Sequence, residues 1–93
     1  MIKSFIGSEA EKIWKGIISK KIDQSIQNVI RRKLVMIDSA EKIETLRFPP
    51  GNHLEFLKGD RKGQFSIRVN NKYRICFNWH DGNALNVEVV DYH

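Results

Sequence analysis

The stretch that decides the fold is residues 65–79, FSIRVNNKYRICFNW, in which apolar and polar side chains alternate on both sides of a polar turn. A period of two is the pattern of a β-strand with one face packed and the other in water. Residues 70–72, Asn-Asn-Lys, have the chemistry of a turn, so the stretch predicts a β-hairpin. Residues 85–90, LNVEVV, follow a second turn at 80–83 and predict a third antiparallel strand.

The register of these strands follows from pairing apolar with apolar side chains. It pairs Phe65 with Phe77 in the first hairpin and Phe77 with Val87 in the second. The same register places Arg68 opposite Arg74 on the face in water, with no carboxylate opposite either of them. Two facing guanidinium groups repel each other, and a phosphate bound between them would relieve the repulsion. The alternative is that both long side chains splay into solvent.

Helices are predicted for the first half of the chain. Ser8 with Glu11, and Asp38 with Glu41, have the spacing of capping boxes that begin two short helices, the first burying apolar residues 13 and 14. Asp23 can cap a longer helix between them. That longer helix carries one apolar stripe, formed by Ile26, Val29, Ile30, Leu34 and Ile37.

These elements together predict an α+β fold. N-terminal helices pack on one face of a small, mainly antiparallel twisted sheet, and residues 1–6 form a short first strand. The helices can cover only the packed face, which leaves the other face of the sheet available for function. With 93 residues, the chain is long enough for a single domain spanning 1–93.

The composition excludes several classes of protein. Hydrophobic residues make up 41% and charged residues 29% of the sequence, an ordinary balance for a globular domain. Cys76 is the only cysteine, which excludes an intramolecular disulfide and a Cys-x-x-Cys metal site. No run of 18 apolar residues and no secretory leader is present, so we expect a cytoplasmic protein without contact with a membrane.

Positive charge is concentrated in one segment. The formal net charge is +5, and residues 57–74 carry all of this excess. Such a segment suits a phosphate-bearing partner or an acidic protein surface, although many basic segments are merely solvated. Its only acidic residue is Asp60, and its basic residues are Lys58, Arg61, Lys62, Arg68, Lys72 and Arg74.

The chain ends on Asp91-Tyr92-His93, which adds a carboxylate, a phenol and an imidazole to these cations. Cleavage of RNA by its own 2′-hydroxyl needs a base, an acid and positive charge near the phosphate. It needs neither a metal nor another cofactor, and the sequence shows no cluster of metal ligands. Each terminal residue also has a plainer interpretation, because chain ends fray, Tyr92 could cap the core, and strict alternation puts Asp91 on the packed face.

Four runs of this sequence resemble the HigB toxins of the RelE/ParE superfamily: 49–52 (PPGN), 57–69 (LKGDRKGQFSIRV), 73–77 (YRICF) and 90–93 (VDYH). The resemblance implies a ribosome-dependent endoribonuclease that cuts messenger RNA and arrests translation. It also implies a HigA-type helix-turn-helix antitoxin, which alone connects the toxin to operator DNA. We expect the free toxin to be a monomer, because its outer surface is polar.

On matching positions the resemblance implies that Lys58 and Arg74 contact the phosphate and the transition state. Asp91, Tyr92 and His93 would then act in proton transfer, stacking or positioning. The remaining basic residues of the segment, Arg61, Lys62, Arg68 and Lys72, are predicted to bind RNA.

One position departs from the family. Some HigB-like toxins carry a histidine three residues before the active-site lysine, where this chain has Glu55. Glu55 could serve as a base if burial raised its pKa, His53 could substitute for it, or His93 could be the main proton-transfer group, leaving a slow nuclease. The alternative function is a ParE-like inhibitor of DNA gyrase without nuclease activity.

Overall fold

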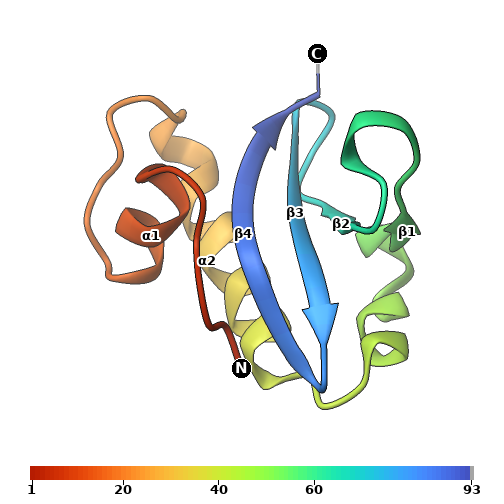
Figure 1. Cartoon of the computed structure of the whole chain (residues 1–93). Coiled ribbons are helices and arrows are strands. Elements are labelled where there is room, and N and C mark those ends of the chain that lie inside the picture. The colour runs from red at the N-terminus through yellow and green to blue at the C-terminus, as the bar shows by residue number, and fades with distance from the viewer. Residues whose placement is uncertain (93) are drawn as a thin grey trace.

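The computed structural model describes residues 1–92 and contains a four-stranded antiparallel sheet (Figure 1). The strands lie in the order β1-β2-β3-β4, so each pairs with its neighbour in the chain. This arrangement confirms the predicted α+β class and the antiparallel sheet. The strands span Glu55–Phe56 (β1), Phe65–Arg68 (β2), Tyr73–His80 (β3) and Asn83–Asp91 (β4).

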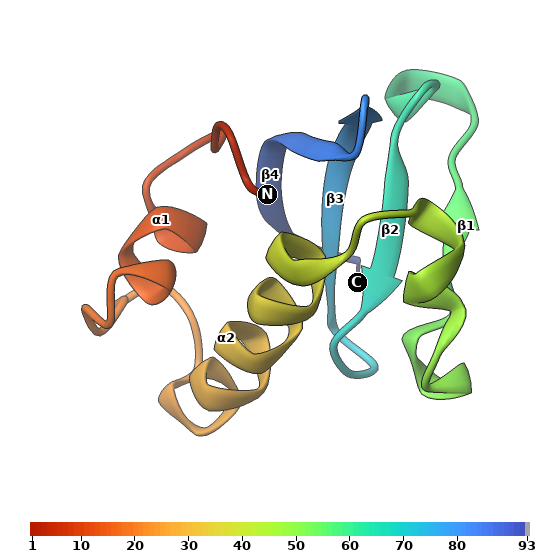
Figure 2. The same cartoon turned by 90° about the horizontal axis from the view of Figure 1, so that it is seen from below.

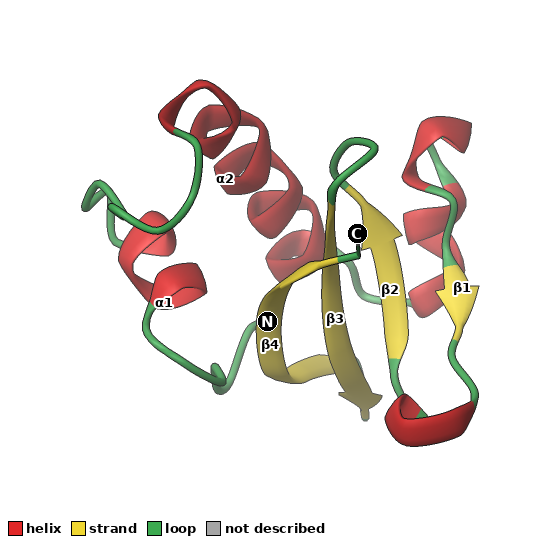
Figure 3. Ribbon diagram, turned by 90° about the horizontal axis from the view of Figure 1, so that it is seen from above, coloured by secondary structure: helices red, strands yellow, loops and turns green. Residues whose placement is uncertain are grey.

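Two α-helices cover one face of this sheet, α1 (Glu9–Trp14) and α2 (Gln24–Ser39). The short 3-10 helix η3 (Gly59–Arg61), between β1 and β2, lies on the opposite side of the sheet from α2 (Figures 2 and 3). Two further 3-10 turns, η1 (Ile43–Arg47) and η2 (Pro50–Asn52), connect α2 to β1. Within residues 1–92, no helix is long and apolar enough to cross a membrane.

Helix α2 forms as its sequence predicts. The Asp23 side chain caps it by accepting a hydrogen bond from the Ser25 amide at 3.1 Å. Three members of the predicted apolar stripe are fully buried against the sheet: Ile30, Leu34 and Ile37. Burial of this stripe positions the helix and leaves the other face of the sheet to η3.

The two predicted capping boxes are wrong, because a neighbouring residue binds the Ser8 side chain and the distant N-terminus binds that of Asp38. The Ser8 hydroxyl donates to Glu9 at 2.6 Å and does not cap α1. The Asp38 carboxylate accepts from the Ile2 amide at 2.9 Å and so ties the N-terminus to the last turn of α2. In place of the third helix predicted from Asp38, η1 begins only at Ile43.

The first six residues do not form the regular strand that was predicted. They run parallel to β4 and make only two isolated bridges, Ile2 with Ala84 and Phe5 with Val87. A strand that was not predicted, β1, completes the sheet on the other side. Because β1 has only two residues, it carries no alternating pattern that could reveal it.

The β2–β3 hairpin has the predicted register. Phe65 pairs with Phe77, and Arg68 pairs with Arg74 on the side away from the helices. Apolar pairing therefore fixed the relative position of the two arginines correctly.

The predicted β3–β4 register fails at one point, a β-bulge. Asn86 has a φ of 54°, a left-handed conformation that asparagine tolerates. The bulge pairs Asn78 with Leu85 and replaces the predicted pair of Phe77 with Val87. Between the bulge and the β3–β4 turn, each β4 side chain therefore points to the face opposite the predicted one. Ala84 is buried in the core, where Leu85 was expected.

Candidate functional site

The sheet face opposite the helices is less open than the alternation predicted. Ser66 and Cys76 lie on this face and are fully buried. The η3 segment folds over it, and its Arg61 reaches across the sheet to Glu88 on β4, with 3.0 Å between Nη1 and Oε1. We call this partly covered surface the η3 face.

Arg74 is the most firmly held cation of the η3 face. Its Nε donates to the Ser66 hydroxyl at 2.8 Å, and its Nη2 donates to the His53 carbonyl at 2.7 Å. The guanidinium carbon lies 5.9 Å from the centre of the Tyr92 ring. Only 11% of the Arg74 side chain is exposed, so the guanidinium is fixed in place.

A carboxylate lies beside Arg74, although the predicted register placed no carboxylate opposite it. Glu55 lies on β1 opposite Ser66, and its Oε1 is 3.7 Å from Nη1 of Arg74. Sequence reasoning missed this pair because it depends on β1. The bonds to Ser66 and His53 hold the guanidinium in place, while its Nη1 has the ion pair with Glu55 but no hydrogen bond within residues 1–92.

Arg68 shares the register of Arg74 but not its surroundings. Its Nε donates to the Asn70 carbonyl at 3.2 Å, and its Nη2 donates to the Asn71 side chain. Arg68 thus binds the hairpin loop, while Arg74 binds β1, β2 and the segment before β1. Because different protein groups hold the two guanidiniums, their repulsion gives no argument for a phosphate bound between them.

The lysines predicted for this site are more exposed. Lys58 precedes η3 and Lys62 follows it, and neither has an ion pair within residues 1–92. Lys72, in the β2–β3 turn, lies 3.9 Å from the Asp91 carboxylate and 5.3 Å from the Tyr73 ring centre. Lys58 and Lys62 are therefore the cations most accessible to a polyanion.

Tyr92 lies between Arg74 and Cys76 at the end of β4. It is 46% exposed, and the centre of its ring lies 5.9 Å from the guanidinium carbon of Arg74. Partial burial raises the pKa of Tyr92, and Cys76 acts in the same direction, so the phenol stays protonated at neutral pH. The neighbouring Asp91 pairs with Tyr73 of the core, so it lies on the helix side of the sheet as strict alternation predicted, although its side chain is exposed. His93 lies outside the described residues.

Arg61 keeps its positive charge although it is partly covered. Burial is the largest single influence and opposes the charge, but the hydrogen bond to Glu88 and the surrounding charges together outweigh it, so the pKa of Arg61 is raised. The same Nη1 donates to the Gln64 side chain at 3.1 Å, and Nε2 of Gln64 donates to Oδ1 of Asn78 at 3.3 Å. Arg61 therefore anchors a row of amides.

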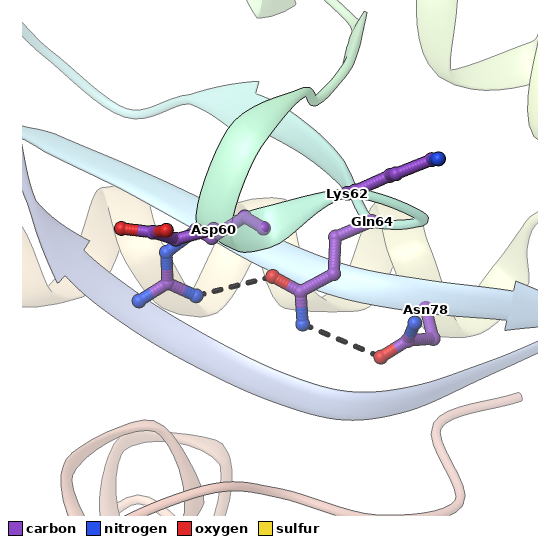
Figure 4. Close-up of a pocket in the computed structure, with 5 residues that line it drawn as sticks. Asp60, Lys62, Gln64 and Asn78 are labelled. Atoms are coloured by element: carbon purple, nitrogen blue, oxygen red, sulfur yellow. Dashed lines mark hydrogen bonds between the residues drawn. The ribbon is translucent and has the colours of Figure 1, made fainter.

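These amides line a hollow of about 480 Å³ under the η3 segment (Figure 4). Its walls are Asp60, Arg61, Lys62, Gln64 and Asn78. Sequence reasoning had singled out the basic residues but had missed Gln64 and Asn78. A signal was available, because extending the Phe65–Phe77 register by one residue places these two amides opposite each other.

Comparison with known proteins identifies the family. A family profile described as "RelE-like toxin of type II toxin-antitoxin system HigB" matches residues 7–93. The chain belongs to the HigB-like toxins. This result confirms the resemblance seen in the sequence.

Two relatives support the assignment to the HigB-like toxins. "Toxin HigB-1" of Vibrio cholerae is 52% identical over 65 residues, which are 70% of this chain and 68% of that protein. "Endoribonuclease HigB" of Proteus vulgaris is 36% identical over 94 residues and covers the whole of both chains.

Among solved structures, the YoeB-YefM toxin-antitoxin complex of Staphylococcus aureus contains a similar chain. Its TM-score is 0.62 at 19% sequence identity, and the match covers 100% of this chain and 98% of that one. At this identity the likeness shows a common fold.

In this HigB-like toxin, the structure brings together some of the predicted site residues and separates others. Arg74, Tyr92 and Arg61 share the η3 face, with Glu55 beside Arg74. The His53 carbonyl binds Arg74, but its imidazole makes no hydrogen bond within the described residues. Residues 1–92 contain no group of three His, Cys, Asp or Glu side chains placed to hold a metal ion.

Proposed function

We propose that this HigB-like toxin is an endoribonuclease that cleaves messenger RNA on the ribosome and so arrests translation. The observation that carries the proposal is the fixed guanidinium of Arg74 beneath the Tyr92 ring. A nearly immobile cation beside a protonated phenol suits the charge that develops on a phosphate under attack. The full-length relative named as an endoribonuclease supports the same activity.

The proposed reaction uses the ribose 2′-hydroxyl as the nucleophile. A bond forms between the 2′-oxygen and phosphorus while the bond from phosphorus to the 5′-oxygen breaks. One group takes the proton of the 2′-hydroxyl and another gives a proton to the departing 5′-oxygen. The products are a 2′,3′-cyclic phosphate and a free 5′-hydroxyl, so atoms and charge balance without a metal ion.

We assign roles to the candidate residues on this basis. Arg74 and Lys58 stabilise the negative charge of the phosphate, and Tyr92 stacks on a base or donates a proton. Asp91 and His93 take part in proton transfer, with His93 as the main group. Histidine suits this task because its ordinary pKa lies near neutrality. The other basic residues, Arg61, Lys62, Arg68 and Lys72, attract the RNA.

Glu55 and His53 receive supporting roles in this proposal. The Glu55 carboxylate is paired with Arg74 and 58% exposed, which suits a group that moderates the guanidinium more than a buried base. His53 contributes its carbonyl to the position of Arg74.

The proposal includes the partners of the toxin. A HigA-type helix-turn-helix antitoxin neutralises it in the cytoplasm, and operator DNA is contacted only through that antitoxin. The family assignment to a type II toxin-antitoxin system supports an antitoxin partner. The free toxin is proposed to be a monomer.

The test is to map the 5′ ends of cellular messenger RNA after induction without an antitoxin. We expect new 5′ ends within coding sequences, and we expect Arg74→Ala to abolish them. Arg32→Ala is the matched control, because Arg32 is exposed on α2, away from the η3 face. Growth arrest with stalled replication and no new 5′ ends would overturn the proposal in favour of a gyrase inhibitor.

A further inference from the structure

We propose that the hollow under η3 is a base-recognition subsite that binds one unpaired nucleobase of the RNA strand. This inference rests on the proposed ribonuclease function and adds the residues that choose where the strand is cut. Its central groups are the side-chain amides of Gln64 and Asn78.

The hollow lies within reach of the candidate catalytic residues. Asn78 and Arg74 stand on the same strand and the same face, four residues apart. A β-strand rises about 3.3 Å per residue, so the two positions are roughly 13 Å apart along β3. An RNA strand with a phosphate at Arg74 can therefore place a neighbouring base in the hollow.

The amides keep hydrogen-bonding capacity that the protein does not use. The Gln64 side chain donates one N–H to Asn78 and accepts one hydrogen bond from Arg61. The Asn78 side chain donates one N–H to the Gly63 carbonyl at 3.4 Å. Each amide nitrogen has a second hydrogen and the Gln64 oxygen a second lone pair, none of them engaged within residues 1–92. Donors next to an acceptor match the edge of a nucleobase, which Asn and Gln can bind with two hydrogen bonds.

Internal contacts hold these amides in one orientation. Oδ1 of Asn78 accepts from both Gln64, at 3.3 Å, and Asn86, at 3.1 Å. Gln64 is bound in turn by Arg61, whose Nη1 lies 3.0 Å from Oε1 of Glu88 and is held by that ion pair. A site that is already ordered loses little conformational entropy on binding, so weak edge contacts can still discriminate.

Charge does not favour a phosphate over a base in this hollow. Glu88 neutralises Arg61, and the Asp60 carboxylate forms part of the wall. The carboxylates of Glu88 and Asp60 match the positive charges of Arg61 and Lys62, so the hollow has no excess positive charge that would favour a phosphate over a neutral base. Lys62 also lines the hollow and can contact the backbone of the same nucleotide.

The first test observes the amides directly in the wild-type protein. The side-chain N–H signals of Gln64 and Asn78 are followed by NMR during titration with the four nucleoside 5′-monophosphates and with ribose 5-phosphate. We expect at least one nucleotide to shift both sets of signals while ribose 5-phosphate leaves them unchanged. Equal shifts with ribose 5-phosphate would mean a phosphate site, and no shift with any nucleotide would also overturn the inference.

The second test measures sequence preference. Gln64→Met and Asn78→Ala are compared with the wild type in the distribution of cleavage sites, and Asn28→Ala, an exposed amide on α2, is the control. We expect both site variants to cut messages but to lose roughly tenfold or more of the preference at one position next to the cut, since a bidentate base contact discriminates by that amount. An unchanged preference in both folded variants would overturn the inference.

The two tests separate this inference from the proposed function. If the wild type cleaves no message, the ribonuclease proposal fails, while the NMR titration still decides whether the hollow binds a base. If the wild type cleaves and the preference is insensitive to both amides, only the subsite is wrong.

Discussion

The carboxylate of Glu55 lies 3.7 Å from the guanidinium of Arg74, so the cation proposed to bind the scissile phosphate already has an anion beside it. The two side chains differ in how free they are to move. Glu55 is 58% exposed on a two-residue strand, whereas Arg74 is 11% exposed and held by Ser66 and His53. An incoming phosphate must therefore displace Glu55 from a guanidinium that stays in place.

Replacement of this carboxylate is predicted to make the toxin faster. Glu55→Gln keeps the shape of the side chain but removes the charge that competes with phosphate. Exposed ion pairs contribute about 0.2–1 kcal/mol, which corresponds to a gain of up to about fivefold in kcat/KM. The measurement is the cleavage rate of messenger RNA on programmed ribosomes.

Glu41→Gln controls for the change in net charge, because Glu41 is an exposed carboxylate that precedes η1. It should leave the rate unchanged. A loss of a hundredfold or more in Glu55→Gln would instead identify Glu55 as the general base.

Arg74 is predicted to require its planar guanidinium. Arg74→Lys keeps the charge but loses the fork that binds Ser66, His53 and phosphate together. Removal of one preorganised donor from a site of this kind lowers kcat by roughly 10²–10³-fold. The rate is compared with that of Arg32→Lys on α2, and urea unfolding verifies the fold of both. A wild-type rate in Arg74→Lys would contradict the role given to Arg74.

The packing of α2 on the sheet is predicted to dominate stability. Leu34 is fully buried, so Leu34→Ala should lower the free energy of unfolding by about 2–5 kcal/mol. The adjacent Val35 is 49% exposed, and Val35→Ala should change it by about 0.5 kcal/mol or less. Urea titration of the two purified variants measures both values, and equal losses would show that the predicted stripe is not the packed face.

The buried thiol predicts a loss of stability at alkaline pH. Burial raises the pKa of Cys76 in the folded protein above its ordinary value of 9.0. The neutral thiol thus favours folding: its contribution is fully present below the unfolded value and is lost as the pH rises through the folded value. The difference in unfolding free energy between wild type and Cys76→Ala should be constant to about pH 8 and should fall above pH 9. Parallel profiles for the two proteins would contradict this account.

Much of the fold was predictable because its signals are local. The α2 stripe and the alternation of β2 and β3 each extend over many residues, so their periods are unambiguous. Strand β1 has two residues, and the bulge at Asn86 depends on one backbone conformation. Neither leaves a periodic pattern in the sequence. The capping boxes failed because Ser8 and Asp38 found other partners.

The candidate site was predictable to the same extent. The register placed Arg74 correctly because apolar pairs determined it. The partners that define its chemistry, Glu55 and the His53 carbonyl, come from a segment about twenty residues earlier in the chain. The extended register predicts that the amides of Gln64 and Asn78 lie opposite each other. A single polar residue on an exposed sheet face has no distinctive sequence pattern, however, so nothing else marks these two as functional.

The most direct measurement compares one messenger RNA in two states, bound to programmed ribosomes and free in solution, after incubation with the purified protein. We predict fragments with a 2′,3′-cyclic phosphate and a 5′-hydroxyl on the ribosome, at a rate that Arg74→Lys lowers about a hundredfold. Intact message on ribosomes saturated with the wild-type toxin would contradict the account.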